Sequence, residues 1–202
     1  MTYELTSIAV RTGSVNAVLA KLEPSLGQAP GGELLACWYS ELGMQNRILV
    51  VREGSPQANA QRDALLQSDD PFGIGDALVS WESDSFAMFP GLPPILAGGY
   101  GNYYEVRTYA LKPGTLRETI ALWVKALPER VKLSPCVGVM YALTGASPRF
   151  LHIWPYKSLD ERQATRKTAV ELGVWPPPGG APGRILTQQV DVYRPAAFSP
   201  LR

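Results

Sequence analysis

An internal repeat limits the fold of this chain more than any other feature. Three segments of the first half match three of the second half in the same order: Tyr3-Glu4-Leu5 with Tyr104-Glu105-Val106, Gly13-Ser14-Val15 with Gly114-Thr115-Leu116, and Glu41-Leu42-Gly43 with Leu143-Thr144-Gly145. The first two pairs share one offset, and the third is displaced by one residue, as a single insertion would produce. We therefore expect two copies of one supersecondary unit in the 202-residue chain.

A segment that disfavours regular structure separates the two copies. It runs from Pro90 to Gly101 and is rich in proline and glycine. Proline cannot donate a backbone hydrogen bond and glycine favours turns, so this segment is expected to be a linker. We place the boundary near residue 97, between one unit at 1–96 and another at 97–202.

The second copy is predicted to run strand, helix, two strands, helix, strand. The predicted strands are 103–111, 136–143, 149–154 and 185–193, and the predicted helices are 116–131 and 159–172. Apolar residues four, three, four and four apart, from Leu116 to Val131, indicate that one stripe of the first helix lies on a sheet. Ser158 is expected to cap the second helix.

The first copy gives the same order of elements. They are a strand at 2–11, a helix at 14–26, a hairpin at 34–53, a helix at 57–68 and a strand at 77–84. The sequence thus predicts an α+β protein of two tandem ferredoxin-like βαββαβ units with antiparallel sheets. Helices on one face of each sheet leave the other face to be covered, and the second copy can supply that cover.

Alternation along two strands of the second unit sorts their side chains into two sets. The first set, expected to face the helices, is Val106, Thr108, Ala110, Leu151 and Ile153. The second set, expected to face the space between the sheets and to bind a ligand, is Glu105, Arg107, Tyr109, Phe150, His152 and Trp154. The repeat aligns Val50 with His152, so the two units are not equivalent and the first is expected to be mainly structural.

Two interpretations of this polar face remain open. Glu105 with Arg107, or Glu4 with Arg52, can form structural ion pairs, because an unpaired buried charge costs several kcal/mol. Alternatively, a few polar groups among aromatic ones can line a pocket for a small molecule. Arg162 and Arg166 lie four apart on one predicted helix face, which is expected to be solvated rather than to bind an anion.

His152 is the candidate catalytic residue because an imidazole can act as acid, base or ligand near neutral pH. A structural role is the alternative. His152 is the only histidine of the chain, which excludes a site with several histidine ligands, and no metal site is predicted. No serine lies in a Gly-x-Ser-x-Gly turn, and the glycine-rich segments lack the lysine of a phosphate-binding loop.

The composition of the chain indicates its cellular compartment and the classes of partner that it can bind. The start of the chain lacks the features of a signal peptide and no segment is apolar enough to span a bilayer, so we expect a cytoplasmic protein. Cys37 and Cys136 are expected to be buried free thiols. Lysine and arginine are scattered and the net charge is +1, which argues against a nucleic-acid-binding surface.

Residues 104–114, followed by His152-Ile153-Trp154-Pro155-Tyr156, Ser158-Leu159-Asp160-Glu161-Arg162 and Phe198-Ser199-Pro200-Leu201, resemble the NIPSNAP family. The first half resembles it only through Tyr3-Glu4, Gly13 and the Gly43/Arg47 pair. The resemblance implies the dimeric α+β-barrel superfamily, and hence an internal pseudo-dimer. Superfamily relatives that bind haem use a histidine ligand, which here implies His152; no cofactor is predicted from the residues themselves.

Three functions follow from these observations. The first is binding of a small or hydrophobic molecule in the barrel interior. The second is a cofactor-poor or haem-dependent enzyme, monooxygenase-like or isomerase-like, as the resemblance implies. The third is a homo-oligomeric module that binds protein partners.

Overall fold

The computed structural model of the chain describes residues 1–28 and 32–202. The first unit comprises β1 (Thr2–Val10), α1 (Val15–Gln28), β2 (Leu34–Leu42), β3 (Arg47–Glu53), α2 (Ala58–Gln67) and β4 (Leu78–Met88), with two short 3-10 turns before β4. The second comprises β5 (Tyr103–Leu111), α3 (Leu116–Arg130), β6 (Gly138–Ala142), β7 (Arg149–Tyr156), α4 (Leu159–Glu171) and β8 (Ile185–Pro195). The predicted order βαββαβ is confirmed for both units.

The strands of both units join into one closed antiparallel barrel. Their order around it is β1-β3-β2-β8-β5-β7-β6-β4, so the first and third strands of each unit are neighbours. The units meet at two seams, where β2 pairs with β8 and β4 pairs with β6. Neither sheet keeps a free edge, because closure pairs the outer strands of one unit with those of the other.

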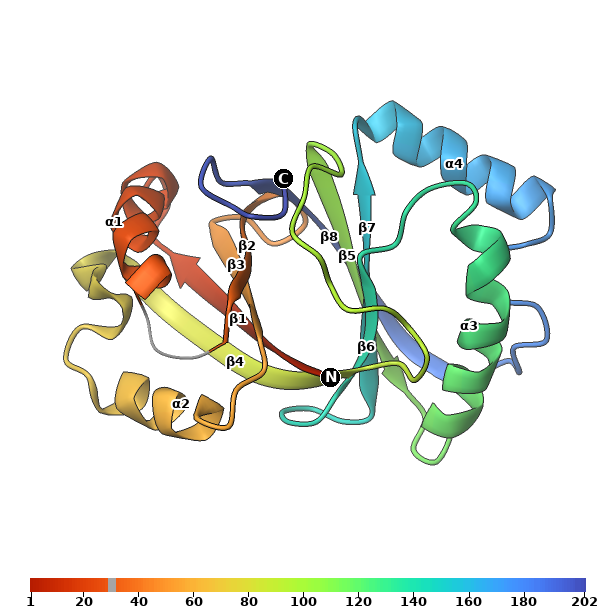
Figure 1. Ribbon diagram of the computed structural model, residues 1–202, viewed down its shortest axis with the longest axis horizontal. Helices are drawn as coiled ribbons and strands as arrows, with labels where there is room; N and C mark the ends of the chain where they lie inside the picture. The colour runs from red at the N-terminus through yellow and green to blue at the C-terminus, as the bar shows by residue number, and fades with distance from the viewer. Residues whose placement is uncertain (29–31) are drawn as a thin grey trace.

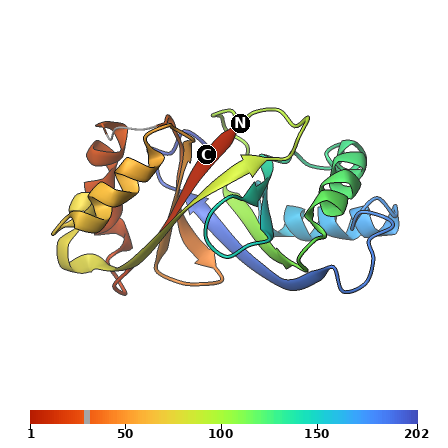
Figure 2. The same cartoon turned by 90° about the horizontal axis from the view of Figure 1, so that it is seen from below.

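The helices lie outside the barrel, in two layers at opposite ends of the molecule. Figure 1 shows α1 and α2 beside the strands of the first unit and α3 and α4 beside those of the second. The view from below in Figure 2 shows the same arrangement, with the barrel between the two layers. Each unit is therefore a sheet with helices on its outer face and the barrel core on its inner face.

Apolar side chains from both units fill the barrel. Trp38 of β2 and Tyr104 of β5 are fully buried and stack with their ring centroids 4.3 Å apart. Tyr3, Leu5, Val106, Leu151 and Ile153 belong to the same cluster. Because residues from both halves form this core, neither half can enclose it alone.

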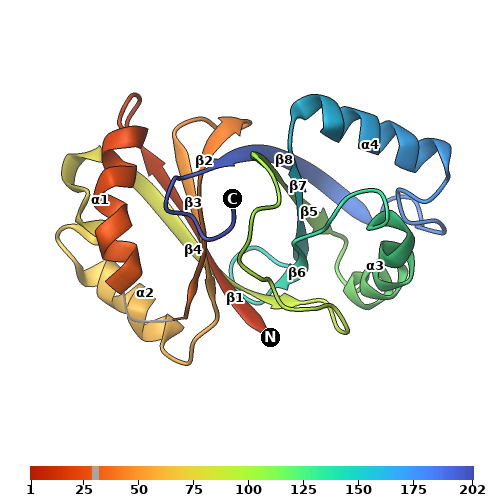
Figure 3. The same ribbon diagram turned by 45° about the horizontal axis from the view of Figure 1, so that its top comes forward.

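The C-terminus closes one end of the barrel. Figure 3 shows it turning back over the opening, beside the β4–β5 connection. Leu201 is fully buried, forms a bridge with Gly98, and accepts a hydrogen bond from the indole of Trp38 at 3.0 Å. The linker predicted from proline and glycine is thus anchored to the last residues of the chain.

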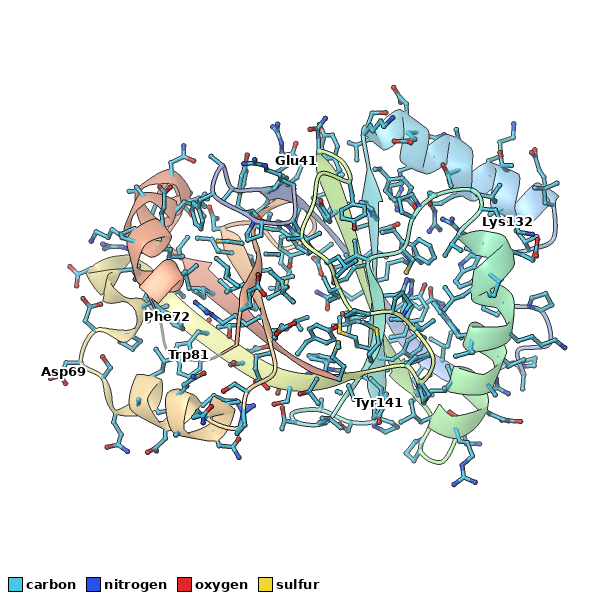
Figure 4. The ribbon with its side chains drawn as sticks, in the orientation of Figure 1. Glu41, Asp69, Phe72, Trp81, Lys132 and Tyr141 are labelled. Atoms are coloured by element: carbon cyan, nitrogen blue, oxygen red, sulfur yellow. The ribbon has the colours of Figure 1, made fainter. Side chains whose placement is uncertain are left out.

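Side-chain patterning accounts for the helix layers. Trp123 and Leu127 of the predicted α3 stripe are buried against the sheet, and the Ser158 hydroxyl accepts from the backbone of Glu161 at 3.1 Å, which confirms the predicted cap. In the first unit Phe72 and Trp81 pack edge to face with centroids 5.6 Å apart (Figure 4). β4 and β7 extend beyond their predicted ends, to Met88 and Tyr156.

Two smaller expectations are also tested by the structure. Cys37 is buried and Cys136 is partly buried, and neither forms a disulfide. Burial raises the pKa of each thiol to about 12, so neither is a reactive thiolate at neutral pH. Among the helices of residues 1–28 and 32–202, none is long and apolar enough to cross a membrane.

Candidate functional site

A cavity of about 940 Å³ lies between the outer face of the second unit's sheet and the helices α3 and α4. The floor is formed by side chains of β5 and β7, and the segment from Trp175 to Arg184 covers one side. Figure 4 shows that side chains occupy the space between the second unit's sheet and its two helices. The cavity is therefore outside the barrel, within one unit.

The predicted facing of the two side-chain sets is wrong. Val106, Leu151 and Ile153 belong to the barrel core, whereas Tyr109, Phe150 and Trp154 pack with α3. Both faces of β5 and β7 are buried, so alternation identified which residues share a face but not which neighbour covers it. The apolar set fills the barrel core, and the polar set faces the helices. There Arg162 of α4 balances the charge of the Glu105 carboxylate.

The six predicted ligand-binding residues nevertheless lie together on one face. Arg107 is opposite His152 in the β5–β7 register, Glu105 is opposite Trp154, and Tyr109 is opposite Phe150. Five of the six line the cavity, and Phe150 packs behind them against Trp123. The sequence thus predicted the residues of this face correctly and its position in the fold incorrectly.

Glu105 organises three arginines at the cavity floor. Its Oε1 atom accepts from Arg107 Nη1 at 3.0 Å and from Arg162 Nη2 at 2.5 Å, and lies 3.8 Å from Arg166 Nη1. The Glu105 residue is 0% exposed, and its Oε2 atom has no hydrogen-bond partner among the described residues. Arg162 and Arg166 therefore do not form the solvated helix face that their spacing suggested.

Arg107 is held by more than this ion pair. Its Nε atom donates to the Tyr109 hydroxyl at 2.7 Å. The predicted Glu105–Arg107 pair is thus present, along β5 and outside the barrel. Glu4 pairs with Arg62 and not with Arg52, which donates to the backbone carbonyls of Leu26 and Gly32.

His152 is enclosed by aromatic rings and cations. Its ring centroid is 4.5 Å from that of Trp123 and 5.0 Å from that of Tyr109. Burial, followed by the charges of Arg107, Arg166 and Arg130, holds the pKa of His152 well below its ordinary value. The imidazole is therefore neutral at physiological pH.

One hydrogen bond determines which nitrogen of His152 carries the proton. The indole Nε1 of Trp154 donates to His152 Nδ1. A neutral imidazole has one donor and one acceptor nitrogen, and an indole N–H can only donate. Nδ1 is therefore the acceptor, and the proton is on Nε2, which lacks a hydrogen-bond partner among the described residues.

This tautomer does not fit the haem ligation that the family resemblance implied. A metal-bound histidine uses an unprotonated nitrogen and donates its other N–H to an acceptor. Here Nδ1 receives a proton donor, so Nε2 lacks the free lone pair that iron requires. In the described part of the chain, no cluster of three or more His, Cys, Asp or Glu side chains could hold a metal ion.

Aromatic side chains form the other wall of the cavity. Trp175 packs edge to face on Trp123 with centroids 4.6 Å apart, and also contacts Trp154. The guanidinium of Arg130 lies 4.2 Å from the centre of the Trp154 ring and donates to the Tyr156 hydroxyl at 3.3 Å. Flat apolar surface thus lies beside the charged floor.

Several of these residues carried no functional signal in the sequence. Trp123 appeared only as part of a helix stripe, Tyr156 appeared only within a segment that resembles the family, and Arg130, Trp175 and Arg184 were not singled out. Arg162 and Arg166 offered a usable clue, since two cations on a helix packed over a strand require an acidic partner there. Trp175 lies in a loop, where no periodicity could place it.

The first unit contains a smaller counterpart of about 330 Å³, between its own sheet and helices. Glu4 and Arg62 form an ion pair there at 2.8 Å, as Glu105 and Arg162 do in the second unit. The cavity is lined by Thr6 and Val50 at the positions that the repeat aligns with Arg107 and His152. The repeat therefore preserves one ion pair, while the guanidinium of Arg107 and the imidazole of His152 have no counterpart at the aligned positions of the first unit.

Acidification is expected to destabilise the folded chain through His152. Because its folded-state pKa lies well below 6.5, the unfolded chain takes up a proton below that pH and the folded chain does not. The free energy of unfolding should fall by up to about 1.4 kcal/mol per pH unit until the pH reaches the folded-state pKa.

Urea denaturation from pH of about 7.5 down to about 5.5 checks this expectation. Other titrating groups contribute equally to the wild type and His152→Phe, so the difference between the two proteins isolates the imidazole. That difference should change with pH in the stated direction. A constant difference across the range would contradict a depressed His152 pKa.

The NIPSNAP family model matches residues 104–200. A protein NipSnap homolog of Dictyostelium discoideum is 29% identical over 78% of this chain and 74% of its own length. Protein NipSnap homolog 2 of Danio rerio is 35% identical over 68% of this chain, and the match spans 50% of the relative, about half its length.

Solved structures share the whole fold. A Lactobacillus acidophilus protein provisionally assigned as a monooxygenase superposes with a TM-score of 0.65, over 96% of this chain and 93% of its own. Its sequence is 10% identical, so this similarity concerns the fold alone. The predicted α+β-barrel architecture is confirmed.

Proposed function

The second unit of this chain belongs to the NIPSNAP family, and from that premise we propose that its sheet–helix cavity binds a small anionic molecule with a flat apolar body. The charged side chains and aromatic rings that line the cavity support both parts of this description. The barrel interior, by contrast, is filled by the packed cluster around Trp38 and Tyr104. The proposed site is therefore the outer cavity.

An excess of positive charge is the observation that carries this proposal. Five cationic side chains and two carboxylates line the cavity, the cations being Arg107, Arg130, Arg166, Lys167 and Arg184. Arg162 and Glu118, which pair with lining residues, add one charge of each sign. Burial, followed by the charge of Arg107, lowers the pKa of Arg166, as expected where cations outnumber their partners.

Arg166 is the cation best placed to receive a ligand anion. It faces Glu105 only at 3.8 Å, whereas Arg107 and Arg162 make close hydrogen bonds to the same oxygen. A ligand carboxylate beside Arg166 would supply the missing negative charge and form charge-assisted hydrogen bonds. The rings of Trp123, Trp154 and Trp175 would then cover a flat apolar body.

Calorimetric titration with naphthoate and with its neutral alcohol, naphthalenemethanol, tests the proposal. We expect naphthoate to bind at least about tenfold more tightly, a difference of about 1.4 kcal/mol, and its affinity to fall as salt is added. Equal affinities for the acid and the alcohol would contradict an anion site. Failure of both compounds to bind would reject the proposed function.

Arg166→Met should weaken naphthoate binding by about tenfold or more, because a hydrogen bond to a charged group contributes about 1.5–3 kcal/mol. The matched control is Arg117→Met, which removes an exposed arginine of α3 that does not line the cavity. Its dissociation constant should stay within about twofold of the wild type. Similar losses in the two variants would indicate a general charge effect rather than a contact.

A further inference from the structure

We propose that the ligand of this cavity is an aromatic carboxylic acid with an adjacent hydroxyl group. Its carboxylate would accept a hydrogen bond from His152 Nε2–H, and its hydroxyl would donate to Glu105 Oε2. The inference rests on the proposed function and specifies the chemistry of the same site. It follows from two buried polar atoms of the cavity floor that lack partners among the described residues.

His152 supplies a donor rather than a base. The indole N–H of Trp154 occupies Nδ1, which leaves the proton on Nε2. The side chain is 1% exposed and lines the cavity, so its N–H is shielded from bulk water. A buried donor without an acceptor is costly, and a ligand oxygen would remove that cost.

Glu105 supplies the complementary acceptor. Its Oε1 atom receives the arginines, and its buried Oε2 atom has no hydrogen-bond partner among the described residues. The carboxylate that pairs with these arginines can only accept hydrogen bonds. A ligand that satisfies Oε2 must therefore carry a hydroxyl or amine proton.

The strand register places His152 and Glu105 close enough for one small ligand to contact both residues. Glu105 is opposite Trp154 and is thus a diagonal neighbour of His152, a relation that corresponds to about 7–8 Å between strand positions. Arg107 is directly opposite His152 and two residues along β5 from Glu105. An aromatic ring with neighbouring carboxylate and hydroxyl groups could place the carboxylate at His152 and Arg166 and the hydroxyl at Glu105.

Other acids would leave one of these atoms without a partner. A plain aromatic carboxylate satisfies His152 but offers no proton to Glu105. A methoxy acid is at least as large as the hydroxy acid. Its ether oxygen can only accept hydrogen bonds, however, and it would face the Glu105 carboxylate, which is also an acceptor. Sites that hydrogen-bond a ligand hydroxyl discriminate strongly against analogues that lack it, because the buried group of the protein then remains unpaired.

Nuclear magnetic resonance of the free protein tests the His152 part without any ligand. Because the chain has a single histidine, labelling with ¹⁵N-histidine reports this ring alone. We expect a protonated Nε2 and an unprotonated Nδ1 at neutral pH, and loss of this preference in Trp154→Phe. A proton on Nδ1, or an imidazolium, would overturn the assignment of His152 as a donor.

Calorimetry with a matched ligand series tests the hydroxyl part. The probes are ortho-hydroxynaphthoate, naphthoate and ortho-methoxynaphthoate, and we expect the hydroxy acid to bind at least about tenfold more tightly than either other acid. Because the chemical change is in the ligand, the result does not depend on a Glu105 variant that could fail to fold. His152→Phe keeps an aromatic ring and should weaken hydroxynaphthoate binding by about tenfold.

The outcomes separate this inference from the proposed function. Equal binding of naphthoate and hydroxynaphthoate would overturn the hydroxyl assignment and leave the anion site supported. Unchanged hydroxynaphthoate affinity in His152→Phe would overturn the carboxylate contact. If none of the three acids binds, both the proposed function and this inference are rejected.

Discussion

Glu105→Gln is expected to lower the free energy of unfolding by about 3–5 kcal/mol, because it removes the carboxylate shared by three arginines and leaves buried positive charge unpaired. Arg107, whose side chain is buried with Glu105, carries most of this effect. Urea denaturation followed by far-ultraviolet circular dichroism measures it. The variant keeps the size of the side chain, so lost packing contributes little.

The repeat provides a matched control for this substitution. Glu4→Gln removes the corresponding carboxylate of the first unit, which pairs with Arg62 alone and is more exposed, at 13% against 1% for the Glu105 side chain. We expect its loss to be less than half of that for Glu105→Gln. Equal losses would show that the additional arginines of the second unit do not depend on Glu105.

Trp38→Ala is expected to destabilise the whole chain by about 3–5 kcal/mol, the usual cost of truncating a large buried aromatic residue. Trp38 of the first unit stacks on Tyr104 of the second and donates to the carbonyl of Leu201, so its removal affects the core that both units build. The barrel should therefore unfold in one transition in the variant, as in the wild type.

Circular dichroism and tryptophan fluorescence, both recorded across one urea titration, check this prediction. Their midpoints should coincide and shift together, since four other tryptophans remain as reporters. Trp38→Phe, which retains a ring for stacking on Tyr104, should lose less stability. Two separate transitions, with only one displaced, would show that the units unfold independently.

Local patterns in the sequence accounted for most of the fold. The spacing of apolar residues from Leu116 to Leu127 predicted α3, and Ser158 predicted the start of α4. These features act between residues close in the chain, where helix and strand periodicities apply directly. The matching segments at Tyr3 and Tyr104 then predicted that the second half repeats the first.

The candidate site was only partly predictable from the same information. Alternation grouped Glu105, Arg107 and His152 on one face because successive side chains of a strand point to opposite sides. It could not state whether α4 or the other sheet covers that face. Trp175, in the loop after α4, contacts Trp123 and Trp154 only because the chain folds back over the cavity.

The sequence by itself determined the two βαββαβ units, the residues that share each strand face and the difference between the halves at His152. The tertiary structure alone decided that this polar face lies against α3 and α4, outside the barrel. The physical reason is that charge balance is a property of neighbours in space. Glu105 is stable there because Arg162 and Arg166 approach from another element, and the proton on His152 Nε2 is set by the indole of Trp154.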